Sequence, residues 1–149
     1  MMYRDYETLF PVLQELNIGF VAFSPLANGF LTARYNKESR FEKGTDYRSV
    51  MPQFTPEAME KNKEMMAYLM ELADRKNATP AQISLAWMLA KESWIVPIPG
   101  TRKYSRLIEN AQAAEVKLEE QEVKELDRML DTVPMSEVFG GSRVERKNN

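Results

Sequence analysis

The sequence contains no cysteine and no histidine. Without cysteine, the chain can form no disulfide, no thiolate metal site and no cysteine nucleophile. Without histidine, it lacks the side chain that most readily exchanges protons near neutral pH and most often binds metals. Ser-His-Asp triads and histidine-based zinc sites are therefore excluded. Any acid–base chemistry must come from aspartate, glutamate, lysine or tyrosine.

The chain also lacks a strong excess of charge and a long apolar run. Its 20 basic and 22 acidic residues give a net charge of −2, whereas a nucleic-acid surface would need a basic face. No run of about 18 apolar residues could cross a bilayer, and the opening MMYRDYETLF lacks the apolar core of a signal peptide. We therefore expect no nucleic-acid partner, no membrane partner and a cytoplasmic location.

Two short apolar runs predict strands. Residues 18–23 (IGFVAF) and 94–98 (WIVPI) are continuous apolar segments, which is typical of strands buried on both faces. The polar segment 27–53 between them has no sustained period. It predicts a long surface loop with at most a short helical turn, and such loops are usually functional or mobile.

Helical spacing and capping signals predict the remaining elements. The Thr-Pro pairs that begin at Thr55 and Thr79 each place a hydroxyl at the N-cap and a proline at the first helical position. Gln82 completes a capping box with Thr79. We predict helices over residues 5–17, 56–76, 80–91, 104–113 and 119–130, and a frayed tail over 136–149.

This order of elements predicts an α/β fold that is mostly helical, with two parallel strands. A lone parallel pair has two unpaired edges and too little sheet to form a core by itself. Either another copy of the chain completes the sheet, or the chain is one part of a larger fold.

Both loops that follow the predicted strands contain glycine. In α/β folds, ligands bind at the carboxyl ends of parallel strands, where loops run into helix N-termini. The first loop, SPLANGFL, offers the hydroxyl of Ser24, and Gly29 lets the backbone approach a ligand. In the second, PGTRKYSR, Gly100 frees the turn, while Thr101 and Ser105 supply donors.

A cluster of cations opens the helix after the second strand, at Arg102, Lys103 and Arg106. A helix N-terminus suits a phosphate, and arginine is shaped for bidentate contacts with one. The cluster therefore indicates an anion site. The alternative is that these side chains are simply solvated.

Three segments, GFVAFSPLANGFLTARY, TPAQISLAWML and IVPIPGTRKYSRLIENAQA, resemble the C-terminal part of the aldo-keto reductase family in order and spacing. The resemblance covers nearly the whole chain. It implies the C-terminal portion of a TIM (β/α)₈ barrel, with residues 18–23 and 94–98 as strands seven and eight. Residues 1–149 would be a single partial domain, completed by another chain. Family members bind NADPH without a Rossmann domain and reduce aldehydes and ketones.

The resemblance implies roles for ten residues. Ser24, Leu26 and Gly29 match the loop that wraps the cofactor pyrophosphate. The loop that holds the adenosine 2′-phosphate is matched by Gly100, Thr101, Arg102 and Lys103. Some branches of the family carry lysine at the position of Gly100, so Arg102 or Lys103 would have to supply that charge here.

The helix that follows supplies the adenine contacts. Arg106 matches the arginine that packs on the adenine and reaches the 2′-phosphate. Glu109 and Asn110 match the pair beside the adenine amine. A purely structural role stays open for two of the ten residues, core packing for Leu26 and backbone hydrogen bonding for Asn110.

The catalytic set of the family is an aspartate, a proton-donating tyrosine, a lysine, and a histidine or glutamate, all on the first half of the barrel. No motif here matches it, and no tyrosine stands in a matching position. We therefore expect a catalytically silent fragment of an NADPH-dependent oxidoreductase, without a metal, that keeps the adenine and 2′-phosphate half of the site. Its parent would transfer hydride from NADPH to a carbonyl substrate while the tyrosine protonates the oxygen.

Two other functions are considered. The chain could be a non-catalytic interaction or nucleotide-binding module in which two or more copies pair their exposed strands. It could also be an enzyme with a new site formed by Lys43, Asp46 or Tyr47 in the long loop, although nothing in their spacing supports this.

Overall fold

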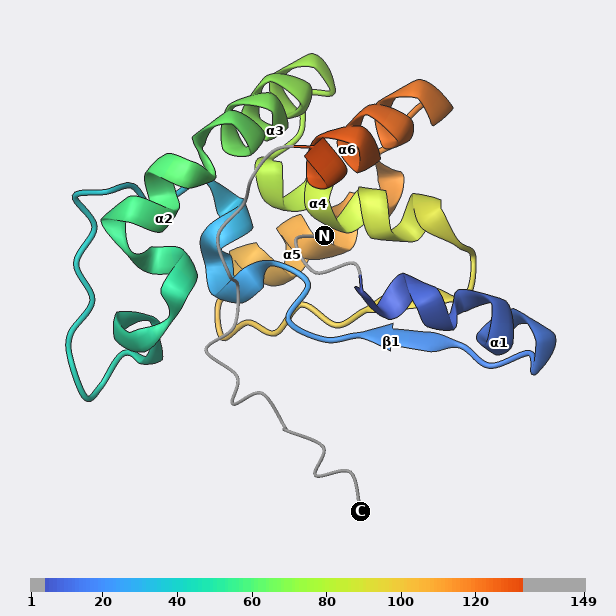
Figure 1. The fold of residues 1–149 in the computed structure, drawn as a ribbon, viewed down its shortest axis with the longest axis horizontal. Coiled ribbons are helices and arrows are strands. Elements are labelled where there is room, and N and C mark those ends of the chain that lie inside the picture. Colours follow the sequence, from blue (N-terminus) through green and yellow to red (C-terminus); the bar gives the residue numbers. More distant parts are fainter. Residues whose placement is uncertain (1–4, 133–149) are drawn as a thin grey trace.

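The computed structural model describes residues 5–132, and the predicted tail over 136–149 lies outside this range. The fold is mostly helical with two parallel strands, as predicted (Figure 1). In chain order the elements, with η for a 3₁₀ helix, are η1 (Asp5–Leu9), α1 (Phe10–Glu15), β1 (Phe20–Ala22), η2 (Ala27–Thr32), η3 (Tyr47–Val50), η4 (Pro52–Phe54), α2 (Pro56–Lys61), α3 (Lys63–Arg75), α4 (Pro80–Lys91), β2 (Ile95–Pro97), α5 (Tyr104–Gln112), η5 (Ala113–Glu115) and α6 (Glu120–Thr132).

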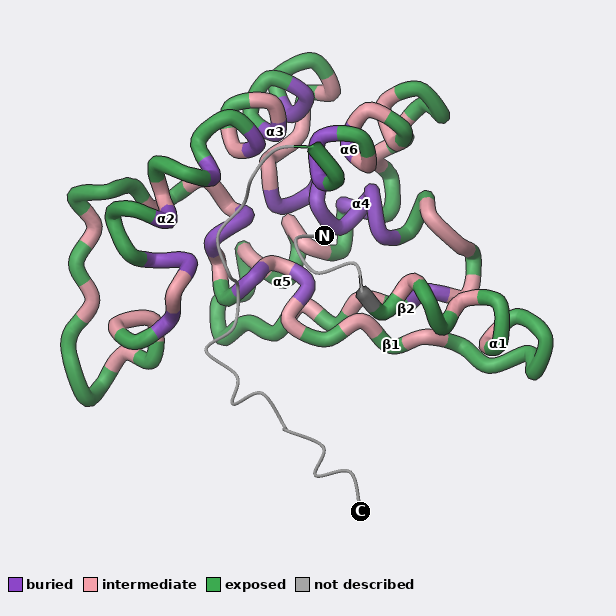
Figure 2. Tube along the Cα trace, in the orientation of Figure 1, coloured by how far each residue is buried: buried purple, intermediate pink, exposed green. Residues whose placement is uncertain are grey.

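The core lies among the helices rather than around the sheet. Figure 2 shows that buried residues gather in α3, α4 and α6, whereas α1 and the strands are mostly half-buried or exposed. Helix α4 is buried over eight consecutive residues, 81–88, as its nearly continuous apolar sequence predicts. The fully buried side chains of the core include Ile83 and Leu85 of α4, Leu69 and Leu72 of α3, and Leu126 of α6.

The two strands pair in parallel, with Val21 opposite Val96. One face of the sheet packs under Phe10 of α1, whose ring lies 5.9 Å from that of Phe20. The other face is bare, because Val21 and Val96 remain 59% and 54% exposed. The prediction of strands buried on both faces is therefore wrong for this chain, since no described residue covers the second face.

The predicted helix over 56–76 is divided at Asn62 into α2 and α3. Asn62 is fully buried, and its backbone has φ −89° and ψ 3°. Asparagine side chains compete with the helix backbone for hydrogen bonds, which is consistent with a break at this position. The predicted loop over 27–53 is also more ordered than expected, because it contains η2 and η3 and enters η4.

Both predicted threonine caps are confirmed. The Thr55 hydroxyl accepts the N–H of Ala58 at 3.2 Å, and the Thr79 hydroxyl accepts that of Gln82 at 3.2 Å. Oε1 of Gln82 accepts a hydrogen bond from the Thr79 N–H at 2.9 Å, which completes the capping box. Within residues 5–132, every helix is too short or too polar to cross a lipid bilayer.

Candidate functional site

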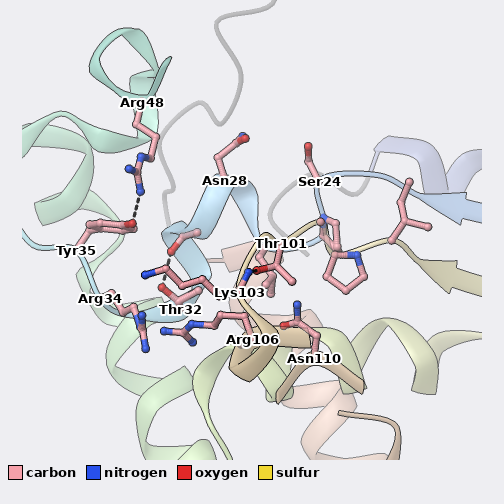
Figure 3. Close-up of a pocket in the computed structure, with 17 residues that line it drawn as sticks. Ser24, Asn28, Thr32, Arg34, Tyr35, Arg48, Thr101, Lys103, Arg106 and Asn110 are labelled. Carbon is pink, nitrogen blue, oxygen red and sulfur yellow. Dashed lines mark hydrogen bonds between the residues drawn. The ribbon is translucent and has the colours of Figure 1, made fainter. Parts of the chain in front are cut away.

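The loops that follow β1 and β2 face each other across a pocket of about 550 Å³ (Figure 3). This volume is within the range of roughly 300–1,000 Å³ typical of small-ligand sites. The first loop and the segment after it contribute Ser24, Pro25, Leu26, Asn28, Gly29, Thr32, Arg34, Tyr35 and Arg48. The opposite side is formed by Ala81, Ile98, Pro99, Gly100, Thr101, Lys103, Arg106 and Asn110.

The lining of this pocket is cationic. It contains Arg34, Arg48, Lys103 and Arg106, and no aspartate or glutamate among the described residues. Arg34 and Lys103 form no ion pair with any residue between 5 and 132. A concave surface lined by positively charged side chains concentrates anions, so the charge pattern fits a phosphorylated ligand.

Eight of the ten residues predicted from the sequence line this pocket. The two exceptions are Arg102 and Glu109. Arg102 is exposed to solvent and does not line the pocket. Glu109 does not line it either, because its carboxylate is turned to Arg106 and Thr79.

The loop after β1 depends on a run of left-handed backbone. Gly29 has φ +93°, and a Cβ at this position would lie 3.3 Å from the Tyr35 ring. Both the backbone angle and the close approach require glycine here. The non-glycine residues with positive φ in the same segment are Ser24, Ala27, Asn28 and Ala33. Such conformations persist only where the surrounding structure fixes them.

The loop after β2 is held by Thr101, whose hydroxyl accepts the Lys103 N–H at 3.1 Å. Helix α5 then begins at Tyr104 without a side-chain cap. The expectation that Gly100 frees the turn is wrong, since Gly100 is not left-handed and a Cβ there would meet only open space.

Arg106 is the most buried of the four cations that line the pocket. Its side chain is 17% exposed, and Nη1 donates to the Glu109 carboxylate one turn later in α5. Nη2 is buried and has no hydrogen-bond partner among the described residues. Because Arg106 also lines the pocket, its guanidinium has unused donor capacity close to the place where an anionic ligand would bind.

Arg48 also lines the pocket, although it was not predicted from the sequence. Its guanidinium lies 4.9 Å from the Tyr35 ring centre and 4.8 Å from that of Phe41, and it donates to the Tyr35 hydroxyl. Asp46 accepts from Arg48 Nε at 2.9 Å and from Nη2 at 2.5 Å. These side-chain hydrogen bonds hold the pKa of Asp46 below its ordinary value and raise the pKa of Arg48.

The sequence held unequal signals for the missed cations. Arg34 stands in the quoted segment LTARY, directly after the first glycine loop, so its position was visible although its role was not. Arg48 lies in a polar segment without periodicity. Only the folded contacts with Tyr35, Phe41 and Asp46 bring it to the pocket.

Replacing Asp46 by asparagine is expected to lower the melting temperature at pH 7 by a few degrees, because the pair with Arg48 is lost. The pKa of Asp46 is depressed in the folded state, so its stabilisation is full above the ordinary value of 3.8 and is lost as the pH falls through the folded pKa. The difference between wild type and variant should therefore vanish in acid. Circular dichroism melts from pH 7 to pH 2.5 test this.

The matched control for that experiment is Glu38→Gln, an exposed carboxylate in the same loop that forms no ion pair with the described residues, so its replacement should leave the melting temperature at pH 7 nearly unchanged. A difference between wild type and Asp46→Asn that stays constant across the pH range would contradict the assignment.

The comparisons with known proteins agree with the sequence resemblance. The family model of the Aldo/keto reductase family matches residues 1–131. The chain therefore belongs to this family. It is 40% identical over 127 residues to aldo-keto reductase yakc [NADP(+)] of Schizosaccharomyces pombe, covering 85% of this chain and 36% of that protein. It is 37% identical over 139 residues to probable aldo-keto reductase 1 of Glycine max, covering 93% of this chain and 39% of that protein.

A solved structure shows the same relationship. The crystal structure of a thermostable aldo-keto reductase in complex with the inhibitor epalrestat superimposes with a TM-score of 0.58 and 29% identity. The match covers 85% of this chain and 36% of the other. The fold is thus a partial barrel of this family, as predicted, and the chain spans little more than a third of the length of these relatives.

Proposed function

We propose that this chain, as one partial domain, provides the adenine and 2′-phosphate half of an NADP(H) site in a cytoplasmic aldo-keto reductase, and that it carries no catalytic residue. The observation that carries the proposal is the cationic pocket lined by Arg106, whose Nη2 has no hydrogen-bond partner between residues 5 and 132. The NADP(+) in the name of the fission-yeast relative supports the choice of cofactor.

The residues present fit the phosphates of this cofactor. Arg106 and Lys103 would hold the 2′-phosphate, together with the Thr101 hydroxyl. Lys103 lines the pocket and Arg102 does not, so we assign the additional charge to Lys103. Arg34 and Arg48 would face the diphosphate, beside the loop of Ser24, Leu26 and Gly29.

The adenine contacts follow from α5. Asn110 lines the pocket and would contact the adenine amine. Both carboxylate oxygens of Glu109 already accept a hydrogen bond, from Arg106 and from Thr79. A carboxylate oxygen can accept more than one, so Glu109 can still contribute to the adenine side while it holds Arg106.

NADPH supplies a hydride for carbonyl reduction when bound. The residues of this chain bind and orient its anionic end. We assign no acid or base role to this pocket: its described lining has no carboxylate, Arg48 donates to the Tyr35 hydroxyl, and Lys103 is assigned to the 2′-phosphate. The carbonyl substrate and the catalytic residues would belong to the remaining part of the barrel.

Calorimetric titration of the chain with NADPH and NADH at low ionic strength tests this proposal. We expect NADPH to bind at least about 10-fold more tightly, as charged hydrogen bonds to the 2′-phosphate would provide. Adenosine 2′,5′-bisphosphate should also bind more tightly than adenosine 5′-monophosphate, by a similar factor. No reduction of aldehydes should occur. Equal affinities for both dinucleotides, or turnover by this chain alone, would contradict the proposal.

A second candidate is an interaction module, and the bare face of the sheet favours it. Val21, Phe23, Val96 and Ile98 are all more than half exposed. An apolar patch of this kind usually contacts another polypeptide. Analytical ultracentrifugation separates the candidates, because a module of this kind requires a dimer or higher assembly and a half-site requires only nucleotide binding.

A further inference from the structure

The capping box at the start of α4 makes contacts beyond its own helix. The Thr79 hydroxyl accepts the Gln82 N–H and donates to Oε1 of Glu109 at 2.9 Å. Gln82 Nε2 donates to the main-chain carbonyl of Glu109 at 3.0 Å. The two residues that cap α4 thus also attach α5, through both the side chain and the backbone of Glu109.

Glu109 also connects this part of α4 to a residue that lines the pocket. Its second carboxylate oxygen, Oε2, accepts from Nη1 of Arg106. Both side chains are largely buried, at 17% exposed for Arg106 and 19% for Glu109. The connection runs from Thr79 through Glu109 to Arg106, which lines the pocket. It leaves Nη2 of Arg106 buried and without a partner in the part of the chain that the structure describes.

We propose that Thr79 and Gln82 are positioning residues that fix Glu109, so that Arg106 presents its guanidinium to the phosphate of an anionic ligand. The identity of that phosphate, the 2′-phosphate of NADP(H), rests on the proposed function. An arginine paired only with a glutamate one turn away keeps much rotational freedom. A second anchor from α4 removes that freedom before the ligand binds, which increases affinity by preorganisation.

The chain provides a matched control for capping alone. Thr55 at the start of α2 is also followed by proline, and its hydroxyl accepts the Ala58 N–H at the same distance of 3.2 Å. Within residues 5–132, the Thr55 hydroxyl makes no contact with α5 or with the pocket. Loss of this hydroxyl removes a helix cap and leaves Arg106 untouched.

The experiment compares wild type with Thr79→Val, Thr79→Ser and Thr55→Val. The first measurement is the ratio of NADPH to NADH affinity by calorimetry. We expect Thr79→Val to lower this ratio about fivefold, as the loss of one hydrogen bond implies. Thr79→Ser should restore the wild-type ratio. Thr55→Val should reduce the melting temperature to a similar extent and leave the ratio unchanged.

The second measurement needs no nucleotide. The guanidinium NMR signals of Arg106 are resolved when rotation of the group is restricted, and we expect them resolved in wild type, Thr79→Ser and Thr55→Val but averaged in Thr79→Val. Unchanged Arg106 signals in Thr79→Val would overturn the proposal, as would an equal fall in the ratio for Thr55→Val.

The two measurements also separate this inference from the proposed function. If wild type binds neither nucleotide, the proposed function fails, and the NMR comparison still decides the inference. Averaged signals in Thr79→Val alone would then support the positioning role, whereas equal signals in all variants would overturn it.

Discussion

Replacing Arg106 by alanine is expected to weaken NADPH binding by about 10- to 100-fold and NADH binding by a smaller factor. This range corresponds to the loss of charged hydrogen bonds worth about 1.5–3 kcal/mol. Arg106 is the pocket cation that has both an anchor, on Glu109, and a buried nitrogen without a partner among the described residues. Its loss should therefore affect the ligand that carries the additional phosphate more than the ligand that lacks it. Calorimetric titration of both dinucleotides measures the effect.

The control for this variant is Arg102→Ala. Arg102 carries the same charge in the same loop, but it is exposed and lies outside the pocket lining. Its removal should change both affinities little beyond a weak effect of net charge that salt screens. Equal losses of NADPH and NADH affinity in Arg106→Ala would contradict the assignment of Arg106 to the 2′-phosphate. An equal effect of Arg102→Ala would show that only the general charge of the loop matters.

Replacing Asp127 by alanine is expected to lower the free energy of unfolding by about 3 kcal/mol. Its carboxylate accepts from the indole Nε1 of Trp87 at 3.0 Å and from Nζ of Lys91 at 2.8 Å. Trp87 is buried, and the Lys91 side chain is only 15% exposed, so both donors would be left poorly satisfied. Lys91 would keep a longer contact with Glu7, at 3.4 Å, which limits the loss. Urea denaturation followed by tryptophan fluorescence and circular dichroism measures it.

Glu125→Ala on the same helix is the comparison for that measurement. Glu125 pairs with Arg128 on the exposed side of α6, and such surface pairs contribute little to stability. We expect an almost unchanged denaturation midpoint for this variant. A similar destabilisation by both variants would mean that any change of charge on α6 lowers the stability, and that the contact of Asp127 with α4 does not contribute more than a surface ion pair.

The sequence predicted helix starts well because the signals for them are local. Helix α4 occupies 80–91 as predicted, since a threonine cap, a proline and a capping box act within four residues. The break at Asn62 was missed because it accompanies the burial of one side chain within the tertiary structure. The burial of the strands was predicted wrongly for a related reason. An apolar run shows that a strand can be covered, but not which part of the molecule covers it.

The site was predictable in its position and less so in its contacts. The rule that ligands bind at the carboxyl ends of parallel strands drew attention to both loops, and eight of the ten residues predicted from the sequence line one pocket between them. The bond between Thr79 and Glu109 joins residues far apart in sequence and has no local signal. The same holds for Arg48, which reaches the pocket through aromatic contacts made only in the folded chain.

The separation of the core from the sheet has a consequence for the order in which the chain folds. Within the helical core, α3 packs against α4, its neighbour in sequence, so little chain has to be closed into a loop for this contact. The strand pair joins residue 20 to residue 95 and gains only partial burial in return. Nuclei form preferentially where contacts are local and apolar, so the helices should assemble first and the strands should join them late. The two loops that line the pocket would then meet only in this last step, and the pocket would be the latest part of the chain to form.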